Sequence, residues 1–359
     1  MNKKIWIMEG LSSQRDILSG INTFSFGGRK NSITTYASHS KMRNEILSIA
    51  DHAIIEPQDD KERLSFIHRI VELTGVEAIH VGRNCRWFEA NRSAIEKYGV
   101  SLTTGATNTD TFDIADDKVT FAQFMAQSGL PVVPSVRVNS WDELHTLIKQ
   151  SPFPENQICI KPVTGIYGKG FWRLDPNATY DAPLSHPENR KINPAQYLSA
   201  LGACDTFEPL VLMPYLPGPE YSVDILLSEC DILSAVGRRK EGAIQYLENS
   251  GEAFELACAC AKAMKADGLV NVQTRNNDQG VPVLLEINLR PSGGIGYTRH
   301  SGINLPGLFA SHKLDLLSAD DVKNETAQSF TPVAVRSITD VLHYELELKN
   351  QLSWMPLPH

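Results

Sequence analysis

The sequence lacks long hydrophobic runs and any excess of basic residues. No stretch approaches the roughly 20 consecutive apolar residues that a membrane-spanning helix needs. The apolar segment before Glu9 is too short for the hydrophobic region of a secretory signal peptide. The net charge of −8 argues against a nucleic-acid backbone as the main partner. These absences predict a cytoplasmic protein that binds neither membranes nor nucleic acid.

Several catalytic and cofactor motifs are also missing. The six cysteines form no CxxC pair, and Cys258 and Cys260 in an Ala-rich helical run favour packing over metal ligation. The ten histidines form no HExxH motif, and the first 110 residues contain no GxGxxG dinucleotide fingerprint. Ser12, Ser13 and Ser292 have no His and Asp setting typical of a serine hydrolase.

The 359 residues are enough for two or three packed units. Within residues 1–110, a helix over about 60–74 has an apolar stripe, a capping Asp59 or Asp60 and a terminating Gly75. Short apolar runs surround it, and we expect strands at 5–8, 32–37, 52–56 and 77–82. This alternation predicts a parallel sheet covered by helices.

From about residue 111 the pattern changes. Helices are expected at 116–129, 140–149 and 251–266, and a strand at 157–162. A hairpin is expected to turn near 229–231, and a second hairpin joins 269–275 to 283–289 through the turn NNDQG. The tail from 311 to 359 carries no pattern that indicates a chemical role.

The second hairpin has an unusual polar row. In VLLEINLRPSGG (283–294), Val283, Leu285, Ile287 and Leu289 alternate with positions that include Glu286, Asn288 and Arg290, so one face is expected to be buried. Cross-strand neighbours lie about 5 Å apart, so Gln273, Glu286 and Asn288 can converge their oxygens. One carboxylate with further oxygen ligands suits Mg²⁺. Taken alone, the hairpin favours a solvated outer face instead.

Two further segments can contact a nucleotide. Lys161 closes a buried strand, and Gly165, Gly168 and Gly170 follow it in a loop whose N–H groups could bind phosphate, although it is not a Walker A loop. The link LMPYLPGPEYSVD (212–224) could present backbone groups to a flat heterocycle. Alone, the glycine-rich loop is more typical of an ordinary surface turn, and the 212–224 link is equally consistent with a plain crossover loop.

Taken together and in order, these segments over roughly 111–296 resemble the ATP-grasp superfamily, in particular its carbamoyl phosphate synthetase-like and carboxylate–amine ligase branch. The resemblance implies an α/β fold: an N-terminal Rossmann-like parallel-sheet domain (1–110), then a two-lobed α+β ATP-grasp domain. Its first lobe would cover 111–205 with the glycine-rich lid at 164–170. Its second lobe would cover 206–359 with the metal-binding hairpin and the tail.

The resemblance also implies roles for individual residues. Lys118 and Lys161 would contact the ATP phosphates, together with Gly165, Gly168 and Gly170 of the lid; Met213, Pro214, Tyr215 and Leu216 would form the adenine hinge; and Glu220 would bind the ribose. Gln273, Glu286 and Asn288 would hold Mg²⁺ or Mn²⁺. Arg290 would face the transferred phosphoryl group. Independently of the resemblance, Arg238 and Arg239 lie at the end of a predicted strand, where they could meet phosphate or a substrate carboxylate, although a surface arginine pair is nearly as consistent with the sequence.

Two positions depart from the family pattern. Met213 replaces an often acidic hinge residue, which removes a side-chain contact to adenine, and Gln273 replaces an acidic metal ligand, which lowers the negative charge of the site.

The implied activity is an ADP-forming ligase that converts a carboxylate into an acylphosphate and joins it to an amine-type nucleophile. The alternatives are a nucleotide-binding regulatory module without turnover, and an ATP-grasp carboxylase or phosphotransferase. The implied partners are the small-molecule carboxylate and amine, and a homodimer is kept as an open alternative for the assembly.

Overall fold

The computed structural model describes residues 2–30, 32–153, 157–165 and 168–343. Two compact units emerge from the contacts, and neither is continuous in sequence. Unit 1 comprises residues 1–112, 220–273 and 287–359, and unit 2 comprises residues 113–219 and 274–286. The expected division into three consecutive domains at 110 and 205 remains a prediction. In the part of the chain that is described, no helix is both long and apolar enough to cross a bilayer.

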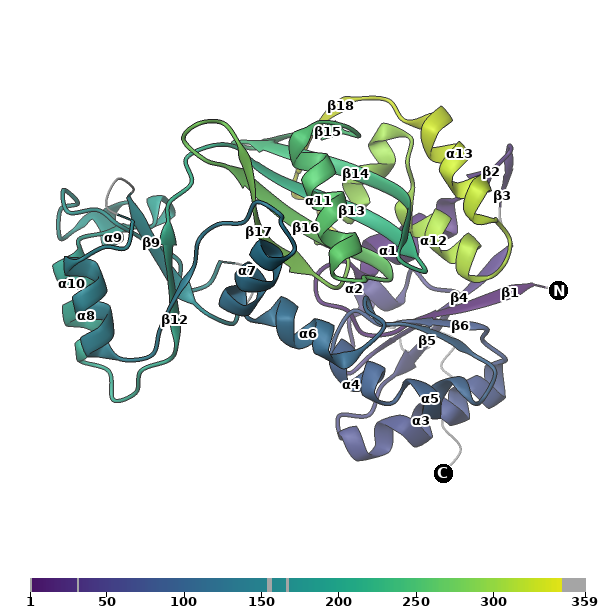
Figure 1. Cartoon of the computed structure of the whole chain (residues 1–359). Helices are drawn as coiled ribbons and strands as arrows, with labels where there is room; N and C mark the ends of the chain where they lie inside the picture. The colour runs from purple at the N-terminus through teal and green to yellow at the C-terminus, as the bar shows by residue number, and fades with distance from the viewer. Residues whose placement is uncertain (1, 31, 154–156, 166–167, 344–359) are drawn as a thin grey trace. The chain divides into compact units, whose positions relative to one another are not determined.

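A five-stranded sheet in the order β5-β4-β1-β6-β7 forms the N-terminal part of unit 1 (Figure 1). Every neighbouring pair in it is parallel, which confirms the expected Rossmann-like sheet. Its strands are β1 (Lys3–Ile7), β4 (Ile33–His39), β5 (His52–Ile55), β6 (Ala78–His80) and β7 (Ser101–Thr103). The helices between them are α1 (Gln14–Thr23), α2 (Asn44–Leu47), α3 (Asp60–Thr74), α4 (Cys85–Ala90) and α5 (Arg92–Glu96).

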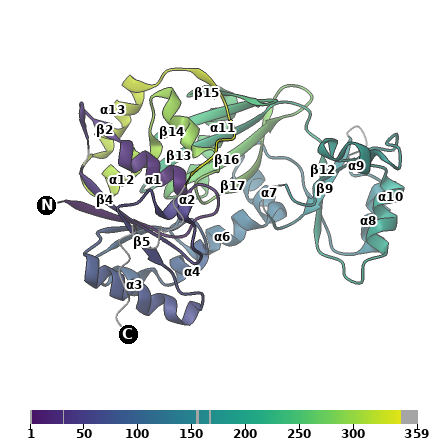
Figure 2. The same cartoon turned by 180° about the vertical axis from the view of Figure 1, so that it is seen from behind.

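Both faces of this sheet are buried, as β1 illustrates. Ile5 and Ile7 point into one hydrophobic cluster, together with residues of α1. Trp6 points into a second cluster, which α3 covers on the opposite face (Figure 2). Because successive side chains of a strand alternate between faces, a sheet covered on both sides needs a nearly continuous apolar sequence. The run IWIM provides it.

Unit 1 also contains the larger part of a six-stranded sheet, in the order β17-β16-β13-β14-β15-β18. Its strands are β13 (Glu220–Ser228), β14 (Asp231–Glu241), β15 (Ile244–Glu248), β16 (Gly268–Asn276), β17 (Pro282–Asn288) and β18 (Val333–Arg336). Residues 274–286, at the ends of β16 and β17, belong to unit 2. The associated helices are α11 (Glu252–Ala263), α12 (Leu305–Lys313) and α13 (Ala319–Ser329), with the 3₁₀ helix η2 (Ile295–Ser301).

Unit 2 is built on a second five-stranded sheet, in the order β11-β10-β9-β12-β8. Its strands are β8 (Val136–Val138), β9 (Ile158–Pro162), β10 (Trp172–Leu174), β11 (Lys191–Ile192) and β12 (Leu210–Pro214). Its helices are α7 (Lys118–Gln127), α8 (Trp141–Lys149), α9 (Ala182–Ser185) and α10 (Pro194–Gly202), with the 3₁₀ helix η1 (Pro187–Asn189). The helix α6 (Thr109–Asp116) connects the two units along the chain. One cluster beneath α8 and α10 and another beneath α7 form the core of this unit.

Some elements differ from the sequence-based expectation. The strand β7 and the small hairpin of β2 (Ser25–Phe26) and β3 (Arg29–Lys30) were not expected, and the tail contributes α13 and β18. On β17, the alternation does not give one buried face. Leu284 is fully buried although it lies between Val283 and Leu285, which are only partly buried. Leu284 pairs with Val132 in a parallel bridge, so another segment covers this edge of β17.

Candidate active site

Lys118 is the first residue of α7. Asp117 caps this helix by accepting hydrogen bonds from the N–H groups of Val119 and Thr120 (3.0 and 2.8 Å). The Lys118 side chain is buried, and its Nζ donates to the carbonyl oxygens of Val163 and Gly165, both at 3.2 Å. The capped helix thus fixes a buried ammonium group against the start of the glycine-rich loop.

Three charged side chains influence one another at this point. Burial lowers the pKa of Lys118, the nearby ammonium of Lys161 lowers it further, and the carboxylate of Glu286 acts in the opposite direction. Lys161 is on β9, where it lies opposite Val211 of β12. All three charged residues belong to unit 2. Two ammonium groups close enough to lower a pKa raise the local affinity for a polyanion.

The glycine-rich loop has left-handed backbone at each of its described glycines. Gly165, Gly168 and Gly170 have φ angles of 134°, 61° and 73°. At Gly170 a side chain is disfavoured by the positive φ angle. It is also excluded by space, because a Cβ there would lie 2.7 Å from Pro162 Cδ. Residues 166 and 167 of the expected lid lie outside the described residues, so its closure stays a prediction.

The expected adenine hinge is the end of β12. Met213 and Leu216 are buried in the same cluster as Val119 of α7. The Pro214 carbonyl accepts a contact from the Cys159 thiol at 3.8 Å, and the Tyr215 N–H donates to the Gln157 carbonyl at 2.6 Å. The hinge backbone is therefore held by β9 and the residue before it.

The guanidinium groups of two arginines lie against the ring of Tyr215 in the hinge. Arg173 Cζ lies 3.7 Å and Arg275 Cζ 5.7 Å from the ring centroid. The Arg275 Nε donates to the carbonyl of Gly218 at 3.0 Å. Neither arginine was assigned a role from the sequence, because each is separated from Tyr215 by about 40 or more residues and has no local motif.

The expected metal ligands are half-buried. Glu286 and Asn288 are two positions apart on β17, and Gln273 is on β16. Asn288 Oδ1 accepts a hydrogen bond from Arg290 Nη1 at 2.9 Å. Among the described residues, no group of three His, Cys, Asp or Glu side chains could hold a metal ion. A divalent ion would therefore depend on one carboxylate, amide oxygens and oxygens from a nucleotide, a donor set that fits Mg²⁺.

Arg238 is buried, which rules out the alternative of a surface arginine pair. Its Nε donates to Asp224 Oδ2 at 2.8 Å, and its Nη atoms donate to Gln245, Ser222 and Ser292. A Cβ on Gly294 would lie 2.5 Å from Arg238 Nη1. Gly294, the second glycine of the RPSGG segment, is thus required by the close approach of this guanidinium group.

Arg239 and Glu220 are each held in an ion pair. Arg239 Nε donates to Glu248 at 2.8 Å, and its Nη1 pairs with Glu241. Glu220, the expected ribose ligand, pairs with Lys240 across the β13–β14 ladder.

A buried polar network beside Arg238 was not predicted. Asn271 is fully buried and donates to Asp224 Oδ1 at 2.9 Å, while its side chain also bonds to Ser222. The sequence does contain a signal for it, since Ser222 and Asp224 occupy alternate positions on an apolar strand. Such polar residues face a buried partner when neighbouring strands offer one.

Comparison with known proteins is consistent with these features. Residues 206–341 match the family described as ATP-grasp in the biosynthetic pathway with Ter operon. The carbamoyl phosphate synthase large chain of Thermomicrobium roseum is 26% identical over 207 residues, which are 52% of this chain and 17% of that protein. The arginine-specific large chain of Halalkalibacterium halodurans is 24% identical over 270 residues, 68% of this chain and 22% of that protein. The chain thus spans about a fifth of the length of these relatives.

Solved structures share the fold at low identity. The ADP complex of N5-carboxyaminoimidazole ribonucleotide synthetase has a TM-score of 0.65 at 16% identity, and the match covers 93% of this chain and 81% of that one. The L-amino acid ligase of Bacillus licheniformis has a TM-score of 0.58 at 14% identity, covering 89% and 76%. The biotin carboxylase domain of the Hydrogenobacter thermophilus 2-oxoglutarate carboxylase has a TM-score of 0.59 at 17% identity, covering 89% and 72%. Residues 206–341 thus match an ATP-grasp family, and the chain as a whole shares its fold with these solved structures.

Proposed function

We propose that this chain is an ATP-dependent, ADP-forming ligase that activates a carboxylate as an acylphosphate and joins it to an amine-type nucleophile. The observation that carries the proposal is the arrangement of Lys118 and Lys161 near Glu286, beside the glycine-rich loop. Two lysines that approach each other in a partly buried position repel, and an anion with several negative oxygens relieves that repulsion.

The proposed reaction uses positioned charge rather than a side-chain nucleophile. A carboxylate oxygen is a poor leaving group, so the acid oxygen would first attack the γ-phosphorus of ATP and ADP would leave. The amine would then add to the acylphosphate carbonyl, and phosphate would depart. Lys118, Lys161 and Arg290 would stabilise negative charge on the transferred phosphoryl group. Gly165, Gly168 and Gly170 would contribute N–H donors to the phosphates.

The base and ribose sites follow from the same proposal. The backbone from Met213 to Leu216 would contact adenine, and Glu220 would exchange its bond to Lys240 for one to the ribose. Arg238 would act as a positioning residue, since its bond to Ser292 holds the segment that follows Arg290.

A divalent ion fits the remaining donors. Glu286, Asn288 and Gln273 would hold Mg²⁺ or Mn²⁺, which when bound would neutralise phosphate charge. Asn288 can bind a cation while keeping Arg290 as a donor, because an amide oxygen has two lone pairs.

The alternatives make different predictions about ADP release. A regulatory nucleotide-binding module would bind ATP without turnover. A carboxylase or phosphotransferase would release ADP without an amine. The repelling lysine pair supports turnover, because binding alone needs fewer phosphate contacts.

A trapping assay tests the proposal directly. The protein is incubated with Mg-ATP and a panel of carboxylic acids, and hydroxylamine serves as the nucleophile. An acylphosphate reacts with hydroxylamine to a hydroxamate, so hydroxamate and ADP should form in equal amounts with at least one acid. Natural amines then replace hydroxylamine. ATP binding with no ADP from any acid would support the regulatory module. ADP formation that no amine accelerates would support the carboxylase or phosphotransferase.

A further inference from the structure

The link between β12 and β13, residues 215–219, contains the second half of the expected adenine hinge. Its sequence is YLPGP, and proline has no backbone N–H group to donate. The link therefore has few N–H groups for a strand ladder, and its position depends on the neighbours that hold it. The link and the residues that contact it, described here for each end in turn, all belong to unit 2.

Backbone hydrogen bonds hold the link at both ends. At its start, the Tyr215 N–H donates to the carbonyl of Gln157, the residue before β9. At its end, the Gly218 N–H donates to the Asn276 carbonyl at 3.0 Å, and the Asn276 N–H donates to the Pro219 carbonyl at 3.2 Å. A Cβ on Gly218 would lie 2.6 Å from Asn276 Cβ, so this close approach requires a glycine. The link is thus attached to the start of β9 and to the end of β16.

Arg173 of β10 reinforces the first attachment. Its Cζ lies 3.7 Å from the centroid of the Tyr215 ring, and its Nη2 donates to the side-chain oxygen of Gln157 at 2.7 Å. The same glutamine therefore binds the arginine through its side chain and the hinge through its backbone. Because a guanidinium group stacks on an aromatic face, this contact holds the ring of Tyr215 as well as its backbone.

Arg275 of β16 reinforces the second attachment. Its Cζ lies 5.7 Å from the centroid of the same Tyr215 ring, within the range of a cation–π interaction, and its Nε donates to the Gly218 carbonyl at 3.0 Å. Arg275 thus connects the ring at the start of the link with the backbone near its end. Both arginines and Tyr215 are half-buried, and cation–π interactions are stronger there than at fully exposed sites.

The two guanidinium groups also lie near the hinge carbonyl. The Cys159 thiol contacts the Pro214 carbonyl oxygen, as described above for the hinge. Burial raises the pKa of this thiol to about 12. The positive charges of Lys161, Arg275 and Arg173 act in the opposite direction, so both guanidinium groups are close enough to influence the thiol.

We propose that Arg173 and Arg275 are positioning residues for the nucleobase, which fix Tyr215 and the hinge groups on either side of it before the nucleotide binds. The inference rests on the proposed ATP site. In that site the Pro214 carbonyl would accept from the amino group of adenine, and the Leu216 N–H would donate to a ring nitrogen. Fixing these groups in advance lowers the entropy cost of binding.

The same fixed hinge excludes guanine. Guanine has a carbonyl oxygen where adenine has its amino group, and an N–H where adenine has the accepting nitrogen. It would place acceptor against acceptor and donor against donor, which is unfavourable unless the hinge rearranges. The two arginines oppose that rearrangement, so they determine the selectivity for adenine over guanine.

Titrations of the full chain measure this selectivity. The ligands are non-hydrolysable analogues of ATP and GTP, and tripolyphosphate reports the phosphate contacts without a base. The wild-type protein should bind the ATP analogue at least about tenfold more tightly than the GTP analogue. Arg173→Met should lower this ratio about three- to tenfold, and Arg275→Met should lower it less because its ring contact is longer.

The matched control is Arg190→Met, which removes the same side chain from an exposed position in the same unit. It should leave the ratio unchanged, and tripolyphosphate affinity should be the same in all three variants. A purely structural role would lower the melting temperature of the Arg173 and Arg275 variants and keep the ratio, and this result would overturn the inference. Should Arg173→Met fail to fold, Arg173→Lys, which keeps the charge but not the planar stack, should lower the ratio relative to Arg190→Lys.

The outcomes separate this inference from the proposed function. A wild-type protein that binds neither nucleotide analogue would overturn the proposed ATP site and this inference with it. A wild-type protein that binds the ATP analogue selectively, together with arginine variants of the same selectivity, would overturn this inference alone.

Discussion

Arg238 and Asp224 form an ion pair that is almost completely buried, with 2.8 Å between Nε and Oδ2 and side-chain exposures of 4% and 0%. Asp224→Asn should destabilise the protein by about 3–5 kcal/mol, because a buried guanidinium loses its counter-charge. Thermal unfolding measures the effect. Asp231→Asn, which breaks the exposed pair with Lys323, is the control and should change the stability far less. Equal effects in both variants would contradict the structural importance of the buried pair.

Lys118→Ala and Lys161→Ala should each lower ATP affinity about ten- to a hundredfold, because a charge-assisted bond to phosphate contributes roughly 1.5–3 kcal/mol. Calorimetry with a non-hydrolysable analogue measures this loss. Lys149→Ala, on an exposed position of α8, removes the same charge from the same unit and should leave the affinity unchanged. Wild-type affinity in both lysine variants would remove the proposed phosphate site.

As the pH rises, ATP affinity should begin to fall at a lower pH than it would with a lysine of ordinary pKa. The pKa of Lys118 is lowered from 10.5, so this side chain loses its charge at a lower pH as the pH rises. Glu286 opposes that shift, and Glu286→Gln should therefore move the loss of affinity to still lower pH. Titrations between pH 7 and 10 measure the midpoint. A midpoint that is insensitive to Glu286→Gln would contradict the coupling of the two groups.

Glu286→Gln should lower kcat at least about tenfold, because the proposed metal site loses its carboxylate. Metal-free ATP affinity at neutral pH should remain the same or increase, since a negative charge near the phosphates is removed. Asp278→Asn, in the exposed turn of the same hairpin, is the control. Steady-state ADP release and a metal-free titration measure the two effects, and unchanged turnover would exclude Glu286 as a ligand.

His80 should make the protein sensitive to acid. It is the last residue of β6 and is fully buried against Phe309 of α12, and burial lowers its pKa to about 4. The folded state therefore excludes a proton that the unfolded chain binds below pH 6.5. Stability should fall as the pH drops from 6.5 toward 4, by about 3 kcal/mol in total. His80→Leu should flatten this part of the stability curve in urea unfolding, whereas the exposed His300→Leu should retain it.

The parallel N-terminal sheet could be predicted because short apolar or β-branched segments alternate with helical patterns, of which α3 is well capped. Asp59 caps α3 and Gly75 ends it in a left-handed conformation, as their positions in the sequence indicate. The strand β7 has only three residues, SLT, and two of them are hydroxylated, so hydrophobic periodicity could not reveal it.

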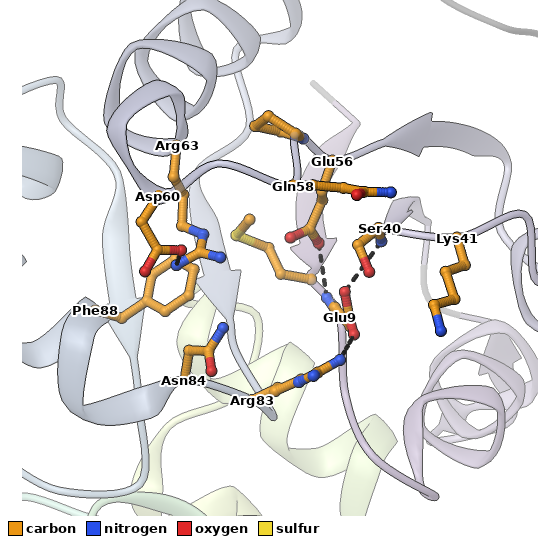
Figure 3. Close-up of a pocket in the computed structure, with 12 residues that line it drawn as sticks. Glu9, Ser40, Lys41, Glu56, Gln58, Asp60, Arg63, Arg83, Asn84 and Phe88 are labelled. Carbon is orange, nitrogen blue, oxygen red and sulfur yellow. Dashed lines mark hydrogen bonds and ion pairs between the residues drawn. The ribbon is translucent and has the colours of Figure 1, made fainter.

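Pairings between distant residues could not be predicted. The Arg275 guanidinium, for example, contacts the Tyr215 ring from a strand that is distant in the sequence. On β17, Leu284 is fully buried although the alternation predicts that it lies on the exposed face, and its bridge partner Val132 is distant in the sequence. A pocket of about 310 Å³ at the carboxyl ends of the N-terminal strands (Figure 3) was missed for the same reason, since its lining residues come from four separate strand ends.

The discontinuity of the two units has a consequence for synthesis on the ribosome. Ile5 of the first strand shares a hydrophobic cluster with Leu226, Leu308 and Val322. This core cannot be completed until α13 has emerged, so the early strands wait for partners that are made about 300 residues later. The first segment of unit 2, residues 113–219, can meanwhile form its five-stranded sheet by itself. During synthesis, the sheet of unit 2 can therefore form before the hydrophobic core of unit 1 is complete.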